Sequence, residues 1–359
     1  MSYVRERLGN LSSATLGLII LVAILVSMTF SISIGTVDLP MSDVYQVMIN
    51  KILNLLHLGG NPDYLHGIDY NIVWTLRAPR VVMAFLIGAA LAMAGVVMQA
   101  TVQNPLADPY ILGMSSGASF GATAAIACGL TATAIGVSSN VSVAFFAFIG
   151  SFVSSMAVLL LSSAGGRTTS VKLVLSGTII SSIFGAFSNL IITLFADAED
   201  MQTITFWLLG SFGGATWSKM VIPGLAFLIC LVYFVTQIRI LNVMLTGDET
   251  ATTLGIDLNR KRRLYVMFCA VLTACAVCFC GVIGFVGLMI PHIVRGLTGN
   301  NHWKLLPMSI LVGGLFMIWA DLAARSILDS GELPIGIITA VCGAPIFAYI
   351  MIKKTYSFA

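Results

Sequence analysis

Long apolar runs follow one another along almost the whole chain, and short polar breaks separate them. A helix needs about 20 mainly apolar residues to cross the hydrocarbon core of a bilayer. Runs of about that length lie near residues 14–35, 81–101, 110–130, 141–163, 171–195, 219–238, 264–283, 304–328 and 333–352. The pattern predicts an all-α, polytopic membrane protein with one transmembrane domain over residues 1–359, because helices satisfy their own backbone hydrogen bonds inside lipid.

A shorter apolar run near residues 284–298 is counted as a tenth transmembrane helix. Its core reads GFVGLMIPHIVRG, with glycine at its start and proline inside, as in a short or broken span. With ten spans and the N-terminus inside, 13 of the 18 Lys and Arg residues lie on the inner side, which agrees with the positive-inside rule. With nine spans, Lys353 and Lys354 would lie outside. We therefore predict ten spans with both termini in the cytoplasm.

Two similar turns start from opposite sides of the predicted membrane. QNPLADPYILGMSSG follows the second run, and GFVGLMIPHIVRG follows the seventh. Each is an apolar segment, interrupted by Gly and Pro, that leads into the next helix. Such inverted repeats are common in transporters, and the sequence predicts one here. Two amphipathic pieces, near residues 41–57 and 201–213, lie between runs.

The composition agrees with a chain surrounded by lipid. Apolar residues make up 58% of the 359 residues, charged residues only 9%, and the mean hydropathy is +0.98. Soluble globular chains carry about 25% charged residues. The net charge of +3 is small, and the basic residues lie in the breaks between apolar runs rather than in one basic patch. We expect the lipid bilayer as a partner, and no nucleic acid.

The motifs that suggest an enzyme are weak. Residues 113–117 match G-x-S-x-G, but a nucleophile elbow needs a strand–turn–helix context that an apolar helical bundle does not offer. His292 is the one candidate base inside a span, and we interpret the match as coincidental. Cys275, Cys278 and Cys280 are interpreted as small side chains that fill a helix contact, rather than as a metal site. We expect no catalytic residue, metal or cofactor, although a membrane enzyme stays an alternative.

An ion-coupled secondary transporter is the more serious alternative. Such carriers keep ionisable groups near mid-membrane, where they are costly and therefore functional. The predicted spans are nearly free of these groups. Asp321 and Arg325 lie four residues apart towards the outer end of one span, where they can pair with each other, and Asp108 falls in an inner turn. The sequence shows no proton or sodium relay. It also has no Walker-type phosphate loop, so energy from ATP would have to enter through another chain.

The longest inner segment, about residues 241–263, reads LNVMLTGDETATTLGIDLNRKRR. Two acidic residues come first, a Leu-Gly pair follows, and four basic residues end the segment. Its first part is expected to form a short helix that Gly255 ends. The segment is either a cytoplasmic loop with topology-setting charges or a docking element against which an ATPase can push.

Six segments, taken in order, carry a family resemblance: LRAPR at 76–80, GAALAMAGVVMQATVQNPLADPYILGMSSGA at 88–118, WLLGSFGGATW at 207–217, GDETATTLG at 247–255, GFVGLMIPHIVR at 284–295 and ELPIGIITAVCGAPIF at 332–347. With them the chain resembles the FecCD-type permease subunits of type II ATP-binding-cassette (ABC) importers, which carry cobalamin, haem and ferric siderophores. The resemblance covers about residues 70–352. This set of segments is specific for the family and only weakly specific for its cargo.

The resemblance implies ten spans per subunit in a homodimer, with the translocation path at the two-fold interface. It implies two ATPase subunits on the cytoplasmic face and an extracytoplasmic substrate-binding protein on the outer face. The location implied is the plasma (inner) membrane of a prokaryote. The expected cargo is an iron chelate, either a siderophore or haem, with cobalamin as the alternative. The extracytoplasmic segment at residues 36–75 is assigned no role.

The resemblance also implies that Arg77, Arg80 and Arg325 are outer arginines that receive acidic residues of the binding protein. A guanidinium group can hold a carboxylate through two parallel hydrogen bonds, which suits this role. The alternative is that these arginines anchor the chain at lipid headgroups.

Further roles implied by the resemblance lie on the cytoplasmic side and along the path. The cytoplasmic gate residues are Asn104, Leu106, Thr168, Thr169 and Ser170. The residues that couple to the ATPase are Gly247, Asp248, Glu249, Leu254 and Gly255. The resemblance leaves open which of the two carboxylates makes the contact. On the fifth span, the candidate path-lining residues are Ser182, Ser188 and Asn189, although such side chains also form hydrogen bonds between helices.

Overall fold

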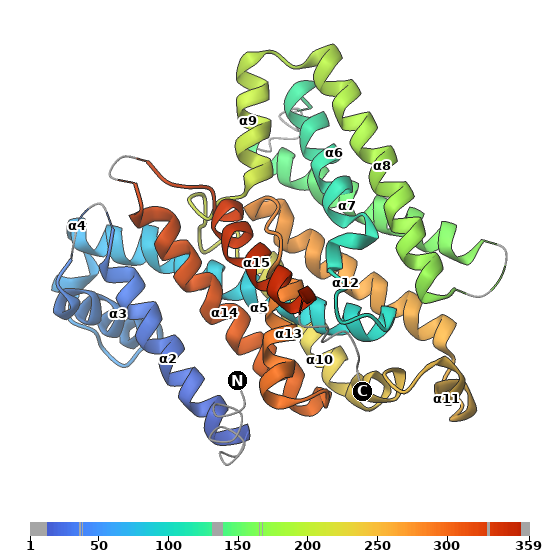
Figure 1. The fold of residues 1–359 in the computed structure, drawn as a ribbon. Helices are drawn as coiled ribbons and strands as arrows, with labels where there is room; N and C mark the ends of the chain where they lie inside the picture. The colour runs from blue at the N-terminus through green and yellow to red at the C-terminus, as the bar shows by residue number, and fades with distance from the viewer. Residues whose placement is uncertain are drawn as a thin grey trace.

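The computed structural model describes residues 13–35, 37, 39–130, 139–164, 166, 168–328 and 331–352. Within these residues the chain is helical and has no strand, and the helices pack into one bundle (Figure 1). The helices are α2 (Ser13–Ser33), α3 (Met41–Leu55), η1 (Pro62–Leu65), α4 (Gly67–Tyr70), η2 (Asn71–Arg77), α5 (Ala78–Val102), η3 (Pro109–Leu112), α6 (Met114–Ala127), α7 (Ser139–Ser163), α8 (Ser170–Phe195), α9 (Ala198–Leu209), α10 (Val221–Met244), α11 (Asp248–Thr253), α12 (Leu258–Cys280), α13 (Val286–Thr298), α14 (His302–Ser326) and α15 (Ile335–Ile352). The predicted all-α fold is confirmed.

Each of the ten apolar runs corresponds to one of these helices. Among the described residues, seven helices are long and apolar enough to cross a bilayer, and they are α2, α5, α7, α8, α10, α12 and α14. The other three are shorter, with 14 residues in α6, 13 in α13 and 18 in α15. The amphipathic pieces form α3 and α9. Lys353 and Lys354, on which the predicted orientation partly rests, lie outside the described residues.

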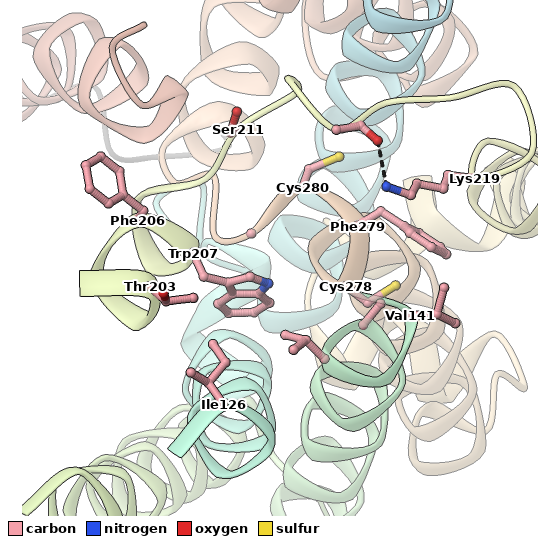
Figure 2. A pocket seen from close by; sticks show the side chains of 14 residues that line it. Ile126, Val141, Thr203, Phe206, Trp207, Ser211, Lys219, Cys278, Phe279 and Cys280 are labelled. Carbon is pink, nitrogen blue, oxygen red and sulfur yellow. Dashed lines mark hydrogen bonds between the residues drawn. The ribbon is translucent and has the colours of Figure 1, made fainter. Parts of the chain in front are cut away.

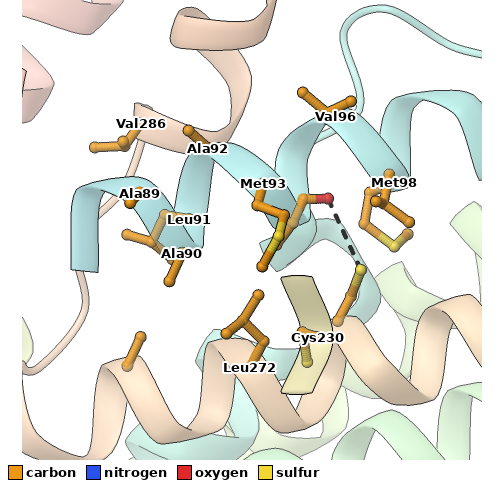
Figure 3. Packing of buried hydrophobic residues seen from close by; sticks show 14 of the residues in the cluster. Ala89, Ala90, Leu91, Ala92, Met93, Val96, Met98, Cys230, Leu272 and Val286 are labelled. Atoms are coloured by element: carbon orange, nitrogen blue, oxygen red, sulfur yellow. Dashed lines mark hydrogen bonds between the residues drawn. The ribbon is translucent and has the colours of Figure 1, made fainter. Parts of the chain in front are cut away.

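The helix α5 is the centre of the bundle. In its most apolar stretch, 83% of the residues are buried, against 11% in α8. It packs against α10, α12, α13 and α14. Figure 3 shows α5 between Val286 of α13 and Leu272 of α12, with Cys230 of α10 beside them. Because α5 is surrounded by protein, its position determines the positions of its neighbours.

Glycine lets the backbones around α5 approach closely. A Cβ atom added at Gly88 would overlap the carbonyl oxygen of Gly313 in α14. One added at Gly95 would overlap the carbonyl oxygen of Gly287 in α13. Small residues at such contacts are the usual means of packing helices in lipid, where no hydrophobic effect drives helices together.

The two turns that the sequence pairs as an inverted repeat meet inside the bundle. A Cβ atom at Gly287 would lie 2.8 Å from Cδ of Pro109, which begins η3 in the first turn. The second turn reaches α13 through Gly281 and Phe285, whose φ angles of 71° and 68° place both in the left-handed region. The turns thus belong to one packed unit with α5.

Two ends of the bundle carry the predicted functional residues. The helix α11 lies at one end, beside the beginning of α12, and α9 lies at the opposite end (Figure 1). We call these the α11 end, predicted to be cytoplasmic, and the α9 end. At the α9 end, Trp74 from the segment at residues 36–75 stacks on Trp217, with ring centroids 4.7 Å apart. The indole nitrogen of Trp217 also donates to the carbonyl oxygen of Trp74, at 2.8 Å.

Replacing Gly95 with valine tests the central role of the α5 contact. The new side chain would have to push α13 away, and overpacking of this kind costs about 1–3 kcal/mol or more. We expect a lower unfolding temperature in detergent and a smaller folded fraction on size-exclusion chromatography. Gly185→Ala is the matched control, because Gly185 lies in α8 with open space around it. Equal unfolding temperatures for the two variants would contradict the packing argument.

Candidate functional site

The short helix α11 is set apart from its neighbours by two glycines. Gly247 precedes it with a φ angle of 106°, and Gly255 follows it with a φ angle of 81°. The N–H group of Gly255 donates to the carbonyl oxygen of Thr252 at 2.9 Å, which closes the last turn. Residues with a side chain rarely adopt such φ angles, so glycine permits the chain to reverse direction at these two positions. The predicted short helix ended by Gly255 is confirmed.

One buried arginine of α12 holds the segments at the α11 end together. The side chain of Arg262 donates to both carboxylate oxygens of Asp248 in α11, at 2.8 and 2.9 Å. It also donates to the carbonyl oxygen of Thr168 at 3.2 Å and to the hydroxyl of Ser170 at 3.0 Å. A further bond of 3.2 Å reaches the carbonyl oxygen of Thr101 near the end of α5. Arg262 therefore contacts three separate segments of the chain, and only 1% of its surface is exposed.

The turn between α7 and α8 is fixed by more than this arginine. The N–H group of Thr168 donates to the side chain of Asn259 in α12, at 2.9 Å. The hydroxyl of Thr169 accepts from the N–H group of Lys172 at 3.3 Å and so caps the N-terminus of α8. The turn is thus attached to the beginning of α12 at two points.

The other predicted gate residues lie just beyond Thr101. The side chain of Asn104 accepts from the N–H group of Leu106 at 2.9 Å, which shapes the turn after α5. Gln103 has a φ angle of 53°, and its amide nitrogen donates to the carbonyl oxygen of Met244 at 2.7 Å. This bond attaches the turn to the end of α10, from which α11 follows.

A groove of about 640 Å³ runs between α11 and the α7–α8 turn. It is lined by Thr168, Thr169, Asp248, Glu249, Thr252, Thr253, Ile256, Asp257, Leu258, Asn259 and Arg262. Glu249 is exposed, whereas the carboxylate of Asp248 is bound by Arg262. Leu254 has 64% of its surface exposed. The α11 end thus presents one acidic and one apolar side chain to its surroundings.

At the α9 end, two of the predicted docking arginines cap the C-terminus of α2. Arg77 donates to the carbonyl oxygens of Ile32 at 2.9 Å and Ser33 at 2.8 Å. Arg325 donates to the carbonyl oxygen of Ser31 and, at 2.7 Å, to its hydroxyl. The last carbonyl groups of a helix have no partner within it, and positive charge is favourable there.

The third arginine, Arg80, forms ion pairs inside the chain. It holds Asp321 at 2.9 Å and Glu332 at 2.6 Å. The side chain of Asp321 is 1% exposed, and Arg325 lies 3.6 Å from its other oxygen, which confirms the expected pair between them. Glu332 is the accessible member, with 44% of its side chain exposed.

The structure thus brings the three arginines together, but their guanidinium groups contact the chain's own carboxylates and carbonyl groups. Each of the three residues is buried. The resemblance implies that they receive acidic residues of a partner. In this arrangement a partner's carboxylate has to compete with groups of the same chain.

The candidate path-lining residues lie on α8, the most exposed of the long helices. Ser182 and Asn189 are exposed, whereas Ser188 is buried. The hydroxyl of Ser188 donates to the carbonyl oxygen of Phe184 in its own helix, at 2.9 Å. The exposed face of α8 therefore offers Ser182 and Asn189, but not Ser188, to a neighbouring surface.

A second cavity, of about 260 Å³, lies at the α9 end (Figure 2). Trp207 of α9 and Cys278 of α12 line it, and Lys219 donates to the carbonyl oxygen of Gly214 at 2.7 Å on one side. Cys278 also packs with alanines of α6 and α7, which confirms the interpretation that it fills a helix contact. The wall of the cavity is mainly apolar.

The G-x-S-x-G match at residues 113–117 has a packing role in the structure. A Cβ atom added at Gly117 would overlap the carbonyl oxygen of Gly150 in α7, so α6 and α7 approach closely at this point. The hydroxyl of Ser154 donates to the carbonyl oxygen of Gly113 at 2.7 Å. The pattern thus serves contact between helices.

Comparison with protein families and curated proteins gives consistent matches. The model of the FecCD transport family matches residues 20–353. The chain is 39% identical over 330 residues to YvrB of Bacillus subtilis, an uncharacterised ABC transporter permease protein, covering 92% of this chain and 91% of that protein. It is 39% identical over 286 residues to the cobalamin import system permease protein BtuC of Halobacterium salinarum, covering 78% and 73%. It is 33% identical over 330 residues to the molybdate import system permease protein MolB of Haemophilus influenzae, covering 92% and 93%.

Solved structures match the fold as well. A structure described as an inward-facing conformation of an ABC transporter of metal-chelate type matches with a TM-score of 0.78 and 31% identity, over 94% of this chain and 99% of that one. The structure of PsaBC from Streptococcus pneumoniae matches with a TM-score of 0.54 and 15% identity, over 77% and 94%, which shows a similar fold alone.

Replacing Arg80 with methionine distinguishes an internal ion pair from a free docking group. Breaking a buried pair leaves an uncompensated charge and costs about 3–5 kcal/mol. We expect a clear fall in unfolding temperature in detergent, and partial recovery when Asp321→Asn removes the stranded charge. Arg263→Gln, at an exposed position of α12, is the control. If Arg80→Met unfolds at the wild-type temperature, the arginine does not hold the fold.

Proposed function

The chain belongs to the FecCD transport family of ABC transporter permeases, and from this premise we propose that it forms the membrane path of an ATP-driven importer. In this proposal two copies enclose the path, two ATPase subunits bind the α11 end, and an extracytoplasmic binding protein docks at the α9 end. The observation that carries the proposal is the α11 end, where an exposed helix is joined to the predicted gate segments through Arg262. The chain lies in the plasma membrane of a prokaryote, with the α11 end inside.

The contact with the ATPase is formed by α11 and the turn that follows it. Glu249 and Leu254 are exposed there, while Asp248 is engaged by Arg262. We therefore assign the contact to Glu249 rather than to Asp248, with Leu254 as the apolar anchor. Gly247 and Gly255 provide the two chain reversals that make α11 protrude.

The inner gate is formed by the turn after α5, with Asn104 and Leu106, and by the turn from Thr168 to Ser170. Both turns are connected to the base of α11, the first through Gln103 and α10 and the second through Arg262. A movement of α11 can therefore displace both turns. Cargo passes along the dimer interface, where the exposed face of α8 supplies sparse polar groups at Ser182 and Asn189.

The cargo proposed is an iron chelate, either a siderophore or haem. The structural match to a transporter of metal-chelate type supports a chelated metal. Cobalamin is the second candidate, supported by 39% identity to a cobalamin permease. In both cases an extracytoplasmic binding protein selects the cargo, and the permease provides a path with few specific contacts.

The binding protein docks at the α9 end when one of its carboxylates competes with Glu332 for the guanidinium group of Arg80. Arg80 holds Glu332, whose side chain is the most accessible part of the arginine cluster. A carboxylate of the binding protein that displaces Glu332 gains the same guanidinium group without exposing Asp321. The buried pairs of the cluster then remain intact while the partner binds.

Reconstitution with the ATPase tests the proposed function. Proteoliposomes that contain this chain, its ATPase partner and its binding protein should take up the chelate only with internal ATP. Uptake that persists without ATP and collapses with a proton or sodium ionophore would identify a secondary transporter instead.

Replacing Gly255 tests the contact between α11 and the ATPase. Gly255→Val, which forces a β-branched residue into a φ angle of 81°, should reduce ATPase co-purification several-fold. Gly296→Ala, at an open position, should leave co-purification unchanged.

Replacing Glu332 with glutamine tests the docking proposal. Removing the competing charge should tighten the Kd of the binding protein by about twofold to fivefold, as expected for a partly exposed ion pair worth up to about 1 kcal/mol. The Kd is measured on permease in nanodiscs at two salt concentrations. Asp69→Asn, which changes an exposed acid of the segment at residues 36–75, is the control. An unchanged Kd for Glu332→Gln would place the docking site elsewhere.

A further inference from the structure

The guanidinium group of Arg262 has every nitrogen engaged. Nε donates to the carbonyl oxygen of Thr101, Nη1 to Asp248 and the carbonyl oxygen of Thr168, and Nη2 to Asp248 and the hydroxyl of Ser170. A guanidinium group has five N–H donors, so these five bonds use its full capacity. The four partner residues come from α5, from α11 and from the turn that begins α8.

These bonds define the relative positions of the segments. The two parallel bonds to Asp248 fix the direction of the carboxylate as well as its distance. Arg262 itself is fully enclosed, so water does not replace a bond that breaks. A displacement of α11 must therefore either leave the buried guanidinium group without its carboxylate or carry Arg262 and its other partners along.

The two acidic side chains of α11 lie in different surroundings. Asp248 points inward to Arg262, and Glu249 is exposed at the groove. The side chain of Asp248 is still 42% exposed, so it lies between the protein interior and the surface on which a partner would bear. Force applied to α11 thus acts directly on the residue that holds Arg262.

We propose that Arg262 is a positioning residue that moves the Thr168–Ser170 turn and the end of α5 together with α11. The proposal rests on the proposed function, since it concerns how a bound ATPase opens the gate. It assigns the Arg262–Asp248 pair to coupling rather than to ATPase binding. Loss of the pair should uncouple ATP hydrolysis from transport, while the complex still assembles.

The experiment compares Asp248→Asn and Arg262→Lys with wild type in the complete reconstituted complex. Asparagine keeps one acceptor oxygen, and lysine keeps the charge but cannot reach all the partners of a planar guanidinium group. We expect ATPase co-purification and ATP hydrolysis near the wild-type level, with chelate transported per ATP reduced about tenfold. Asp248→Glu, which retains the carboxylate, should keep at least half of the wild-type ratio. Arg263→Gln, the neighbouring exposed arginine, should keep all of it.

A distance measurement gives a second readout. Spin labels at Val171 in α8 and Thr253 in α11, both exposed, report whether the two segments move together. The exposed Cys128 and Cys342 are first replaced by serine. In wild type the distance should stay the same with and without ATP, and in Asp248→Asn it should change between the two states. A constant distance in both proteins, or a wild-type transport ratio in Asp248→Asn, would overturn the proposal. A wild-type complex that fails to bind the ATPase would instead contradict the proposed function.

Discussion

Close contact between backbones at α5 is the constraint on which the rest of the structure depends. In lipid no hydrophobic effect draws helices together, so they must pack through small residues. At Gly88 and Gly95 the backbone of α5 lies directly against α14 and α13. The same helix extends to both functional ends, with Arg80 near its beginning and Thr101 near its end. A shift of α5 would therefore disturb the arginine cluster at one end and the Arg262 cluster at the other.

Buried arginines perform related tasks at the two ends, and this explains why a chain with only 9% charged residues retains them. Helix ends and turns leave carbonyl groups without partners, which is costly where water is scarce. Arg77 and Arg325 bind carbonyl groups at the end of α2, and Arg262 binds those of Thr101 and Thr168. One guanidinium group satisfies several carbonyl oxygens at once, because its donors form a rigid plane.

The sequence predicts the helices well and the clusters poorly, for a physical reason. Length and hydropathy identified all ten apolar helices, and Gly255 indicated the end of α11, because both signals are local. No local pattern in the sequence indicates that Arg262 is buried. This residue lies within four consecutive basic residues, which fit a topology-setting loop equally well. Its partners are between 14 and 161 residues away, so only the packing of helices brings them together. The same holds for Glu332, which lies 252 residues from Arg80.

The two clusters differ in a way that indicates which end moves. Asp321 is 1% exposed and lies between two arginines, so opening that cluster would leave uncompensated charges buried within the protein. Asp248 is 42% exposed and lies on a six-residue helix flanked by glycines, so a partner that binds α11 can act on this residue while Arg262 stays buried. The arginine cluster at the α9 end is thus enclosed, whereas the Arg262 cluster can be reached by a partner and can move as a unit with its ion pair closed. An importer built on this chain should keep α2, α14 and the first part of α5 as a fixed frame and concentrate its movement around α11, the end of α5 and the two turns connected to them.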